Sequence, residues 1–85
     1  MKKMAVTYGQ LDKVLRSLGF TSRVVKGDPS ALRYDHKETG ASFMIPSLPA
    51  NQRVWEHHLV TAKVMVDQNG IADPEVFEAK LQKVG

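Results

Sequence analysis

Residues 7–46 read TYGQLDKVLRSLGFTSRVVKGDPSALRYDHKETGASFMIP. Thr7 stands three residues before Gln10, which is the spacing of a helix N-terminal capping box. Apolar residues then recur at helical spacing, and Gly19 stands where a helix often ends on a residue with positive φ. We therefore predict a helix over residues 7–18, whose apolar stripe is Leu11, Val14, Leu15 and Leu18. The positions expected to face water are Asp12, Lys13, Arg16 and Ser17.

Three short segments with alternating apolar and polar residues follow, at 20–26, 31–36 and 41–45. Turn-forming residues separate them at 27–30 and 37–40. Short turns between successive strands predict an antiparallel three-stranded meander. The face expected against the helices carries Leu32, Tyr34, Phe43 and Ile45, and the opposite face carries Ala31, Arg33, Ser42 and Met44.

Two further helices are expected after a proline-rich loop. The first covers residues 54–69, ends at Gly70, and has an apolar stripe of Trp55, His58 or Leu59, Ala62, Met65 and Val66. The second begins after Asp73, with Pro74 as its first residue, and has a stripe of Val76, Phe77, Leu81 and Val84. We expect this last helix to cover Val60 and Val64, in the same chain or in a second copy, and Trp55 to anchor a core or an interface.

These patterns predict an α+β fold: an α-β-β-β-α core with a three-stranded antiparallel sheet packed on helices on one face, plus an extra C-terminal helix. With 85 residues the chain is expected to form one domain, 1–85, with a loose N-terminal tail at 1–6. No apolar run approaches the roughly 20 residues of a membrane span, and no secretory leader is seen, so a cytoplasmic location without membrane contact is expected.

Several classes of chemistry lack the residues that they need. The chain has no cysteine, which excludes disulfides, thiolate zinc sites and thiol nucleophiles. It has no phosphate-binding glycine loop or dinucleotide pattern, so no cofactor is expected. His57 and His58 are adjacent on a helix and point about 100° apart, so no metal site is expected there.

The net charge of +3 is compatible with an acidic partner. Four cations, Arg23, Lys26, Arg33 and Lys37, are candidates to line the open sheet face and its hairpin rim. There they would meet RNA phosphates or an acidic protein. The alternative is a solvated charged strand face, which protects a sheet edge from aggregation.

Residues 11–46 resemble the HicA toxin family, the mRNA interferases of HicA/HicB toxin-antitoxin pairs, whose fold is like that of double-stranded RNA-binding domains. The resemblance lies in the order and spacing of five short features. They are Leu18-Gly19-Phe20, Val25-Lys26-Gly27, Leu32-Arg33-Tyr34 with His36 beyond, a turn at Gly40, and a strand ending on Ile45-Pro46. The resemblance implies contact with RNA or with an antitoxin-like protein.

The family's catalytic histidine has no counterpart in this chain. In the family, the glycine after the first strand is followed closely by a serine and by the catalytic histidine. Here Gly27 is followed by the inserted Asp28 and Pro29, then by Ser30 and Ala31. A methyl group cannot transfer a proton, so general acid-base catalysis, worth about 10² to 10⁴ in rate, has no agent at this position.

Three functions remain open at this stage. The first is a HicA-like protein that binds RNA without ribonuclease activity. The second is an active mRNA interferase that uses His36, which lies on the same strand as Ala31 but on the other face by alternation. The third is a protein-interaction module without nucleic acid, which includes a homodimer formed through the C-terminal helices.

Overall fold

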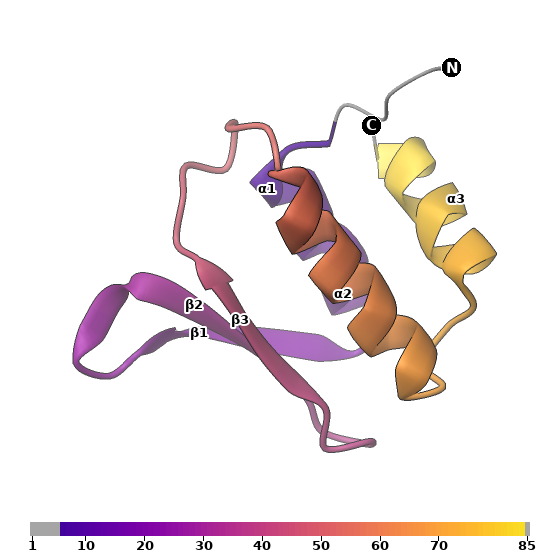
Figure 1. Ribbon diagram of the computed structural model, residues 1–85, viewed down its shortest axis with the longest axis horizontal. Helices are drawn as coiled ribbons and strands as arrows, with labels where there is room; N and C mark the ends of the chain where they lie inside the picture. Colours follow the sequence, from indigo (N-terminus) through magenta and orange to yellow (C-terminus); the bar gives the residue numbers. More distant parts are fainter. Residues whose placement is uncertain (1–5, 85) are drawn as a thin grey trace.

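The computed structural model of the protein describes residues 6–84. The elements follow the chain as α1 (Tyr8–Ser17), β1 (Phe20–Val25), β2 (Asp28–His36), β3 (Ser42–Pro46), α2 (Glu56–Gln68) and α3 (Pro74–Val84). The strands form one antiparallel sheet in the order β1-β2-β3. Helices α1 and α2 pack on one face of the sheet, α1 against β1 and α2 against β3 (Figure 1). The predicted α+β fold, with its extra C-terminal helix, is confirmed.

Helix α1 begins and ends as its sequence predicts. The Thr7 hydroxyl accepts a hydrogen bond from the backbone N–H of Gln10 at 3.3 Å, and the Gln10 side chain accepts from the Thr7 N–H at 2.9 Å. Gly19 follows the helix with φ of +99°, and a Cβ on it would lie 3.0 Å from Nε2 of His36. Glycine is therefore required here both by the backbone conformation and by the close histidine.

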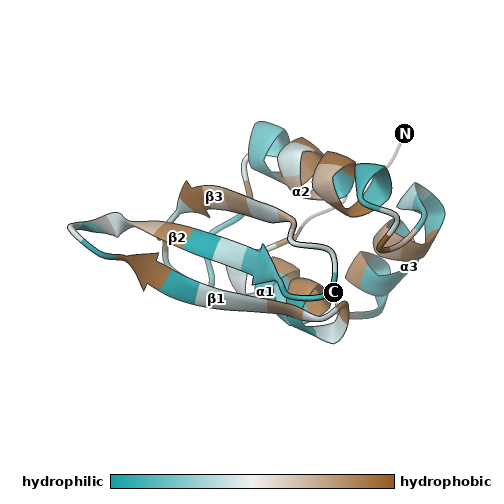
Figure 2. Cartoon of the chain, turned by 90° about the horizontal axis from the view of Figure 1, so that it is seen from below, coloured by the Kyte–Doolittle hydropathy of each residue, from teal (hydrophilic) through white to brown (hydrophobic). Residues whose placement is uncertain are grey.

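Strand register gives the sheet two chemically different faces. On the inner face Ser22 pairs with Tyr34, and Tyr34 pairs with Phe43, beneath the helices. On the other face, called the open face from here on, Arg23 pairs with Arg33 and Arg33 pairs with Met44. Figure 2 shows the sheet from this side, with no helix in front of it. The predicted division of β2 and β3 into two faces is confirmed.

The first hairpin turn lies earlier than expected. Val25 pairs with Asp28, so the loop between β1 and β2 is only Lys26 and Gly27, and the expected turn at 27–30 is wrong. The register shifts between Val24 and Val25, which is the mark of an irregularity or bulge, and Gly27 takes φ of +87°. Because residues 29–31 of β2 have no paired partner on β1, strand alternation could not place this turn.

One hydrophobic core joins the sheet to all three helices. Leu11 and Phe43 belong to it, and the partly buried Leu59 packs against it, as packing of the helices on a single face requires. Helix α3 packs on α1 and α2, far from the strands in Figure 1, and contributes the fully buried Phe77 and Leu81. The predicted stripe of α3 is thus confirmed at these two positions, whereas Val76 is exposed and the Val84 side chain lies outside the described part.

Two expectations for α2 fail within this chain, whereas their alternatives, coverage of Val60 and Val64 by a second copy and an interface role for Trp55, stay predictions. Val60 and Val64 are 50% and 40% exposed, so α3 of the same chain does not cover them. Trp55 is 59% exposed and does not anchor the core. Helix α2 instead contributes Ala62 and Val66 to the core, because these residues lie on the opposite side of the helix from Val60 and Val64.

The chain before α1 is tied to the loop between β3 and α2. Val6 is 2% exposed, and its carbonyl accepts a hydrogen bond from the Val54 N–H at 2.8 Å. The Gly9 N–H donates to the Ala50 carbonyl at 2.9 Å. The expected loose tail at 1–6 is therefore wrong for Val6, and its other residues, 1–5, lie outside the described part. None of the three described helices has the length and apolarity needed to cross a bilayer.

Candidate functional site

Arginines face each other across the two strands that carry the open face. Arg23 on β1 and Arg33 on β2 are directly paired in register. Asp35, two residues along β2, accepts a hydrogen bond from Nε of Arg33 at 2.9 Å, and its other oxygen lies 3.6 Å from Nε of Arg23. Because the guanidinium groups keep most of their donors, one carboxylate orients both arginines without using up their capacity to bind an anion.

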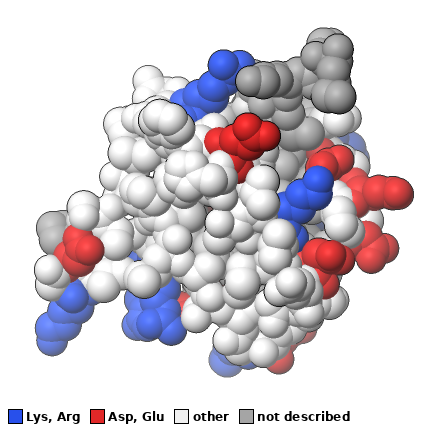
Figure 3. All heavy atoms as spheres, viewed as in Figure 1, with Lys and Arg blue, Asp and Glu red and all other residues white. Residues whose placement is uncertain are grey.

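A shallow groove of about 270 Å³ runs beside these arginines toward the hairpin turn. Its lining residues are Arg23, Val24, Val25, Lys26, Arg33 and Met44. Lys26 thus joins the two arginines, and we call Arg23, Lys26 and Arg33 the cation cluster. In Figure 3 basic side chains project below the β1-β2 hairpin, with an acidic group at the hairpin end, and on the side of α3 acidic side chains lie next to basic ones.

Lys37 does not join the cation cluster. It follows the last residue of β2, in the turn between β2 and β3, whereas Lys26 lies in the turn before β2. A nine-residue strand separates the two turns, which corresponds to roughly 30 Å at 3.3 Å per residue. Any contact of Lys37 with a ligand of the cluster would need a ligand that spans the whole sheet.

Ala31 lies at the hairpin end of the open face, opposite Pro46 of β3. It is half-buried, and α3 packs elsewhere. The neighbouring Ser30 hydroxyl donates to the Asp28 carboxylate, and the Ser30 N–H donates to the same oxygen at 3.2 Å. A serine held in this way stabilises the local backbone where β2 begins.

His36 lies inside the protein, at the far end of β2. It is 6% exposed, its ring packs on Phe20 with centroids 5.0 Å apart, and both ring nitrogens have partners. Nδ1 lies 2.9 Å from the Thr39 hydroxyl, and Nε2 lies 3.0 Å from the Leu18 carbonyl. An imidazole enclosed in this way fixes the β2-β3 turn to the end of α1, and it cannot reach an RNA strand without a rearrangement.

The other two histidines do not form a metal site. Nδ1 of His58 lies 2.7 Å from the Tyr8 hydroxyl, which also accepts a hydrogen bond from the Trp55 N–H at 3.3 Å. Burial lowers the pKa of His58, and repulsion from the adjacent His57 lowers it further. Among residues 6–84 no group of three or more histidine or acidic side chains is arranged to hold a metal ion.

One polar cluster was not expected from the sequence. The Tyr34 hydroxyl donates to Oδ1 of Asp12 at 2.7 Å, and Nε of Arg16 donates to Oδ2 of Asp12 at 2.8 Å. Nη2 of Arg16 donates in turn to the Ser22 hydroxyl. Asp12 was expected to face water, but it is half-buried beside the inner face of the sheet. A buried tyrosine needs a partner for its hydroxyl, and this requirement is the sequence signal that could have indicated a polar residue opposite Tyr34.

The chain matches no known protein family, no curated protein and no solved structure.

Proposed function

We propose that this chain is a HicA-like domain that binds RNA through the open face of its sheet and does not cleave it. The observation that carries the proposal is the convergence of Arg23, Lys26 and Arg33 on one groove. Cations that lie close together on one face bind a phosphate backbone and release its counterions. The choice of RNA rather than another polyanion rests on the resemblance of residues 11–46 to the HicA family.

The composition of the open face indicates how RNA would be held. Beside the cations it carries Met44, which is 60% exposed, and small residues such as Ala31 and Ser42. It has no aromatic side chain among its paired positions, so it offers no stacking platform for bases. We therefore expect the open face to contact phosphates and to show little sequence preference.

We expect no cleavage because the histidine that would transfer protons is missing from the open face. General acid-base catalysis needs a titratable group within about 3 Å of the reacting atoms. The open face near the cluster has Ala31 where the family has histidine, and the imidazole of His36 is buried beneath the other face with both nitrogens in use. The alternative based on His36 would require that histidine to leave the core, and we do not propose it.

Fluorescence anisotropy with a labelled single-stranded RNA tests the proposal. We expect a double variant, Arg23→Gln with Arg33→Gln, to bind on the order of tenfold or more weakly, because two phosphate contacts are lost. The matched control carries Lys13→Gln and Lys83→Gln, which remove the same charge from α1 and α3 and should change the affinity much less. Equal losses in both proteins would show that net charge, not the cluster, binds RNA.

A parallel incubation of the wild-type protein with the same RNA checks for cleavage. We expect the RNA to remain intact under single-turnover conditions, because no histidine lines the groove and Asp35 beside it is paired with Arg33. Products that appear with wild-type protein would contradict the non-catalytic part of the proposal, whatever the affinity.

One observation favours a second candidate, a protein-interaction module. Trp55, Val60 and Val64 are exposed at the start and on the outer side of α2, and exposed apolar groups of this kind occur at interfaces. A homodimer or a complex with an antitoxin-like protein would cover them. Sedimentation over a range of concentrations tests self-association, with Val60→Lys expected to abolish it and Gln82→Lys on α3 as the control. A monomer at every concentration would remove the homodimer.

A further inference from the structure

A cavity of about 260 Å³ lies on the opposite side of the sheet from the cation cluster. It is bordered by α1, by the inner face of the sheet and by the loop that follows β3, and it is open to solvent on its remaining side. Gly9 and Ala50 line it, and the Gly9 N–H donates to the Ala50 carbonyl at 2.9 Å. A Cβ at position 9 would lie 3.1 Å from that carbonyl oxygen, so glycine allows the loop to approach the helix.

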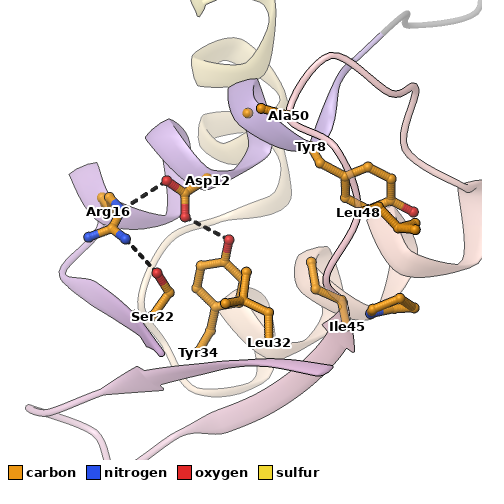
Figure 4. A pocket seen from close by; sticks show the side chains of 11 residues that line it. Tyr8, Asp12, Arg16, Ser22, Leu32, Tyr34, Ile45, Leu48 and Ala50 are labelled. Carbon is orange, nitrogen blue, oxygen red and sulfur yellow. Dashed lines mark hydrogen bonds and ion pairs between the residues drawn. The ribbon is translucent and has the colours of Figure 1, made fainter. Parts of the chain in front are cut away.

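The two sides of this cavity differ in chemistry (Figure 4). On one side Arg16, Asp12 and the Tyr34 hydroxyl form a hydrogen-bonded chain. The aliphatic side chains of Leu32, Ile45 and Leu48 are further lining residues. A cavity with apolar walls and a few fixed polar groups is the usual form of a site for a small organic ligand.

The polar chain keeps unused hydrogen-bonding capacity. An arginine has five N–H donors, and two are used here, by Asp12 and by Ser22. An ionised carboxylate has about four acceptor positions, and Asp12 uses two, for Arg16 and Tyr34. Burial raises the pKa of Tyr34, as does its hydrogen bond to Asp12, so the phenol keeps its proton and remains a donor. A ligand thus meets a donor group beside an acceptor group, both held in place.

The charge of the site selects a neutral ligand. Arg16 and Asp12 form an ion pair at 2.8 Å, so their charges cancel, and neither an anion nor a cation gains a net attraction from the pair. The aliphatic lining adds favourable contact with apolar surface. A neutral heterocycle meets both conditions if its faces contact the aliphatic side chains and one edge carries an acceptor next to donors.

We propose that this cavity binds the guanine base. The Watson-Crick edge of guanine presents the O6 acceptor, the N1–H donor and the N2 amino donor in sequence. In this arrangement Arg16 donates to O6, and the Asp12 carboxylate accepts from N1–H and N2–H. Leu32, Ile45 and Leu48 contact the ring. No other common base presents one acceptor followed by two donors, so uracil, adenine and cytosine leave part of the site unpaired.

The base can come from a free guanosine compound or from a guanine within RNA. The inference does not rest on the proposed contact of RNA with the open face, because the cavity and the cation cluster lie on opposite faces of the sheet. Both sources offer the same edge to Arg16 and Asp12, and the experiment distinguishes them.

Titration with guanosine and with inosine, followed by the NMR signals of the Leu32, Ile45 and Leu48 methyl groups, tests the proposal. Inosine lacks only the 2-amino group, so guanosine is expected to bind about tenfold more tightly. Adenosine should cause no comparable shifts. In a second arm, an RNA with a single guanine in a uridine background is compared with the same RNA carrying inosine. A difference there assigns the base to RNA, whereas a difference only between the nucleosides assigns it to a free compound.

Two variants connect the result to the residues. Asp12→Asn keeps an oxygen that can accept from Tyr34 but loses an acceptor, so the preference for guanosine over inosine should fall to about one, whereas the control Asp67→Asn on α2 should keep it. Arg16→Gln changes an exposed residue and should weaken guanosine binding about tenfold even if Asp12→Asn does not fold. No methyl shifts with guanosine, or equal affinities for guanosine and inosine in the wild-type protein, would overturn the proposal. RNA binding lost in Arg23→Gln with Arg33→Gln, but guanosine binding kept, would show that the two sites are separate.

Discussion

Removal of the Tyr34 hydroxyl tests the polar contact that joins α1 to the sheet. In Tyr34→Phe the ring remains, stacked on Phe43 with centroids 5.4 Å apart and planes at 18°, so only the hydrogen bond to Asp12 at 2.7 Å is lost. A hydrogen bond to a charged group is worth about 1.5 to 3 kcal/mol. The Asp12 side chain is 30% exposed, so water can replace the lost donor, and we expect the lower value, about 1.5 kcal/mol.

For a domain of this size that loss lowers the thermal midpoint by about 6 to 12 °C. Urea unfolding of Tyr34→Phe, of Asp12→Ala and of the double variant gives the coupling energy, which should be about 1 kcal/mol. A pH series adds a readout specific to the hydroxyl. Because the pKa of Tyr34 is raised in the folded state, the unfolded state releases its proton first, and stability falls as the pH rises above about 10.

The alkaline loss of stability should be smaller in Tyr34→Phe than in the wild type, since the variant has no proton to release at this position. The contact between α1 and β2 would be contradicted if Tyr34→Phe were as stable as the wild type. It would also be contradicted if Tyr34→Phe lost the same stability in the wild-type protein as in the Asp12→Ala variant.

Three further outcomes follow from single contacts. Gly19→Ala should destabilise the protein by about 2 kcal/mol, because a positive φ costs about 1 to 2 kcal/mol and the new methyl group contacts His36. Gly27 has a similar φ but open space around it, so urea unfolding of Gly27→Ala should show a loss about 1 kcal/mol smaller. The pKa of His58 is lowered in the folded state, so the unfolded state binds the proton first and wild-type stability decreases as the pH is lowered below about 6.5. His58→Gln should make this decrease smaller, and equal slopes in the two proteins would contradict the prediction. Asp35→Asn should tighten RNA binding about threefold by removing a negative charge beside Arg33, and weaker binding would show that Asp35 mainly orients the arginine.

Local sequence signals predicted most of the fold because they act over a few residues. The capping box of Thr7 and Gln10 and the glycine at position 19 define α1 without help from the rest of the chain. Alternation assigned Arg33 and Tyr34 to opposite faces of the sheet, since successive side chains of a strand point in opposite directions. The same alternation put His36 on the inner face, and there the structure buries it.

Features that depend on distant residues were not predicted. The contact between Asp12 and Tyr34 joins residues 22 positions apart, and it requires the angle between α1 and the sheet to be known. The outward position of Val60 depends on how α3 lies across α1 and α2, which a helical pattern does not specify. The hairpin turn lies earlier than predicted because the register changes between Val24 and Val25. This change depends on how the two strands pair, and the turn residues alone do not reveal it.

The candidate site was only partly accessible to sequence reasoning. Alternation and net charge indicated cations on one face, and three of the four expected residues, Arg23, Lys26 and Arg33, line one groove. Lys37 carries the same charge and also lies in a hairpin turn, but the length of β2 separates it from Lys26. Distance along a strand, not residue type, decides which charges act together.

The salt dependence of RNA binding tests the role of the cation cluster most directly. If Arg23, Lys26 and Arg33 each neutralise a phosphate, the affinity for single-stranded RNA should fall with a log-log slope of about −2, or roughly 20-fold between 50 and 200 mM salt. In the Arg23→Gln with Arg33→Gln variant the slope should shrink to about −0.7. An unchanged slope in that variant, or wild-type binding that does not depend on salt, would contradict RNA binding by the open face.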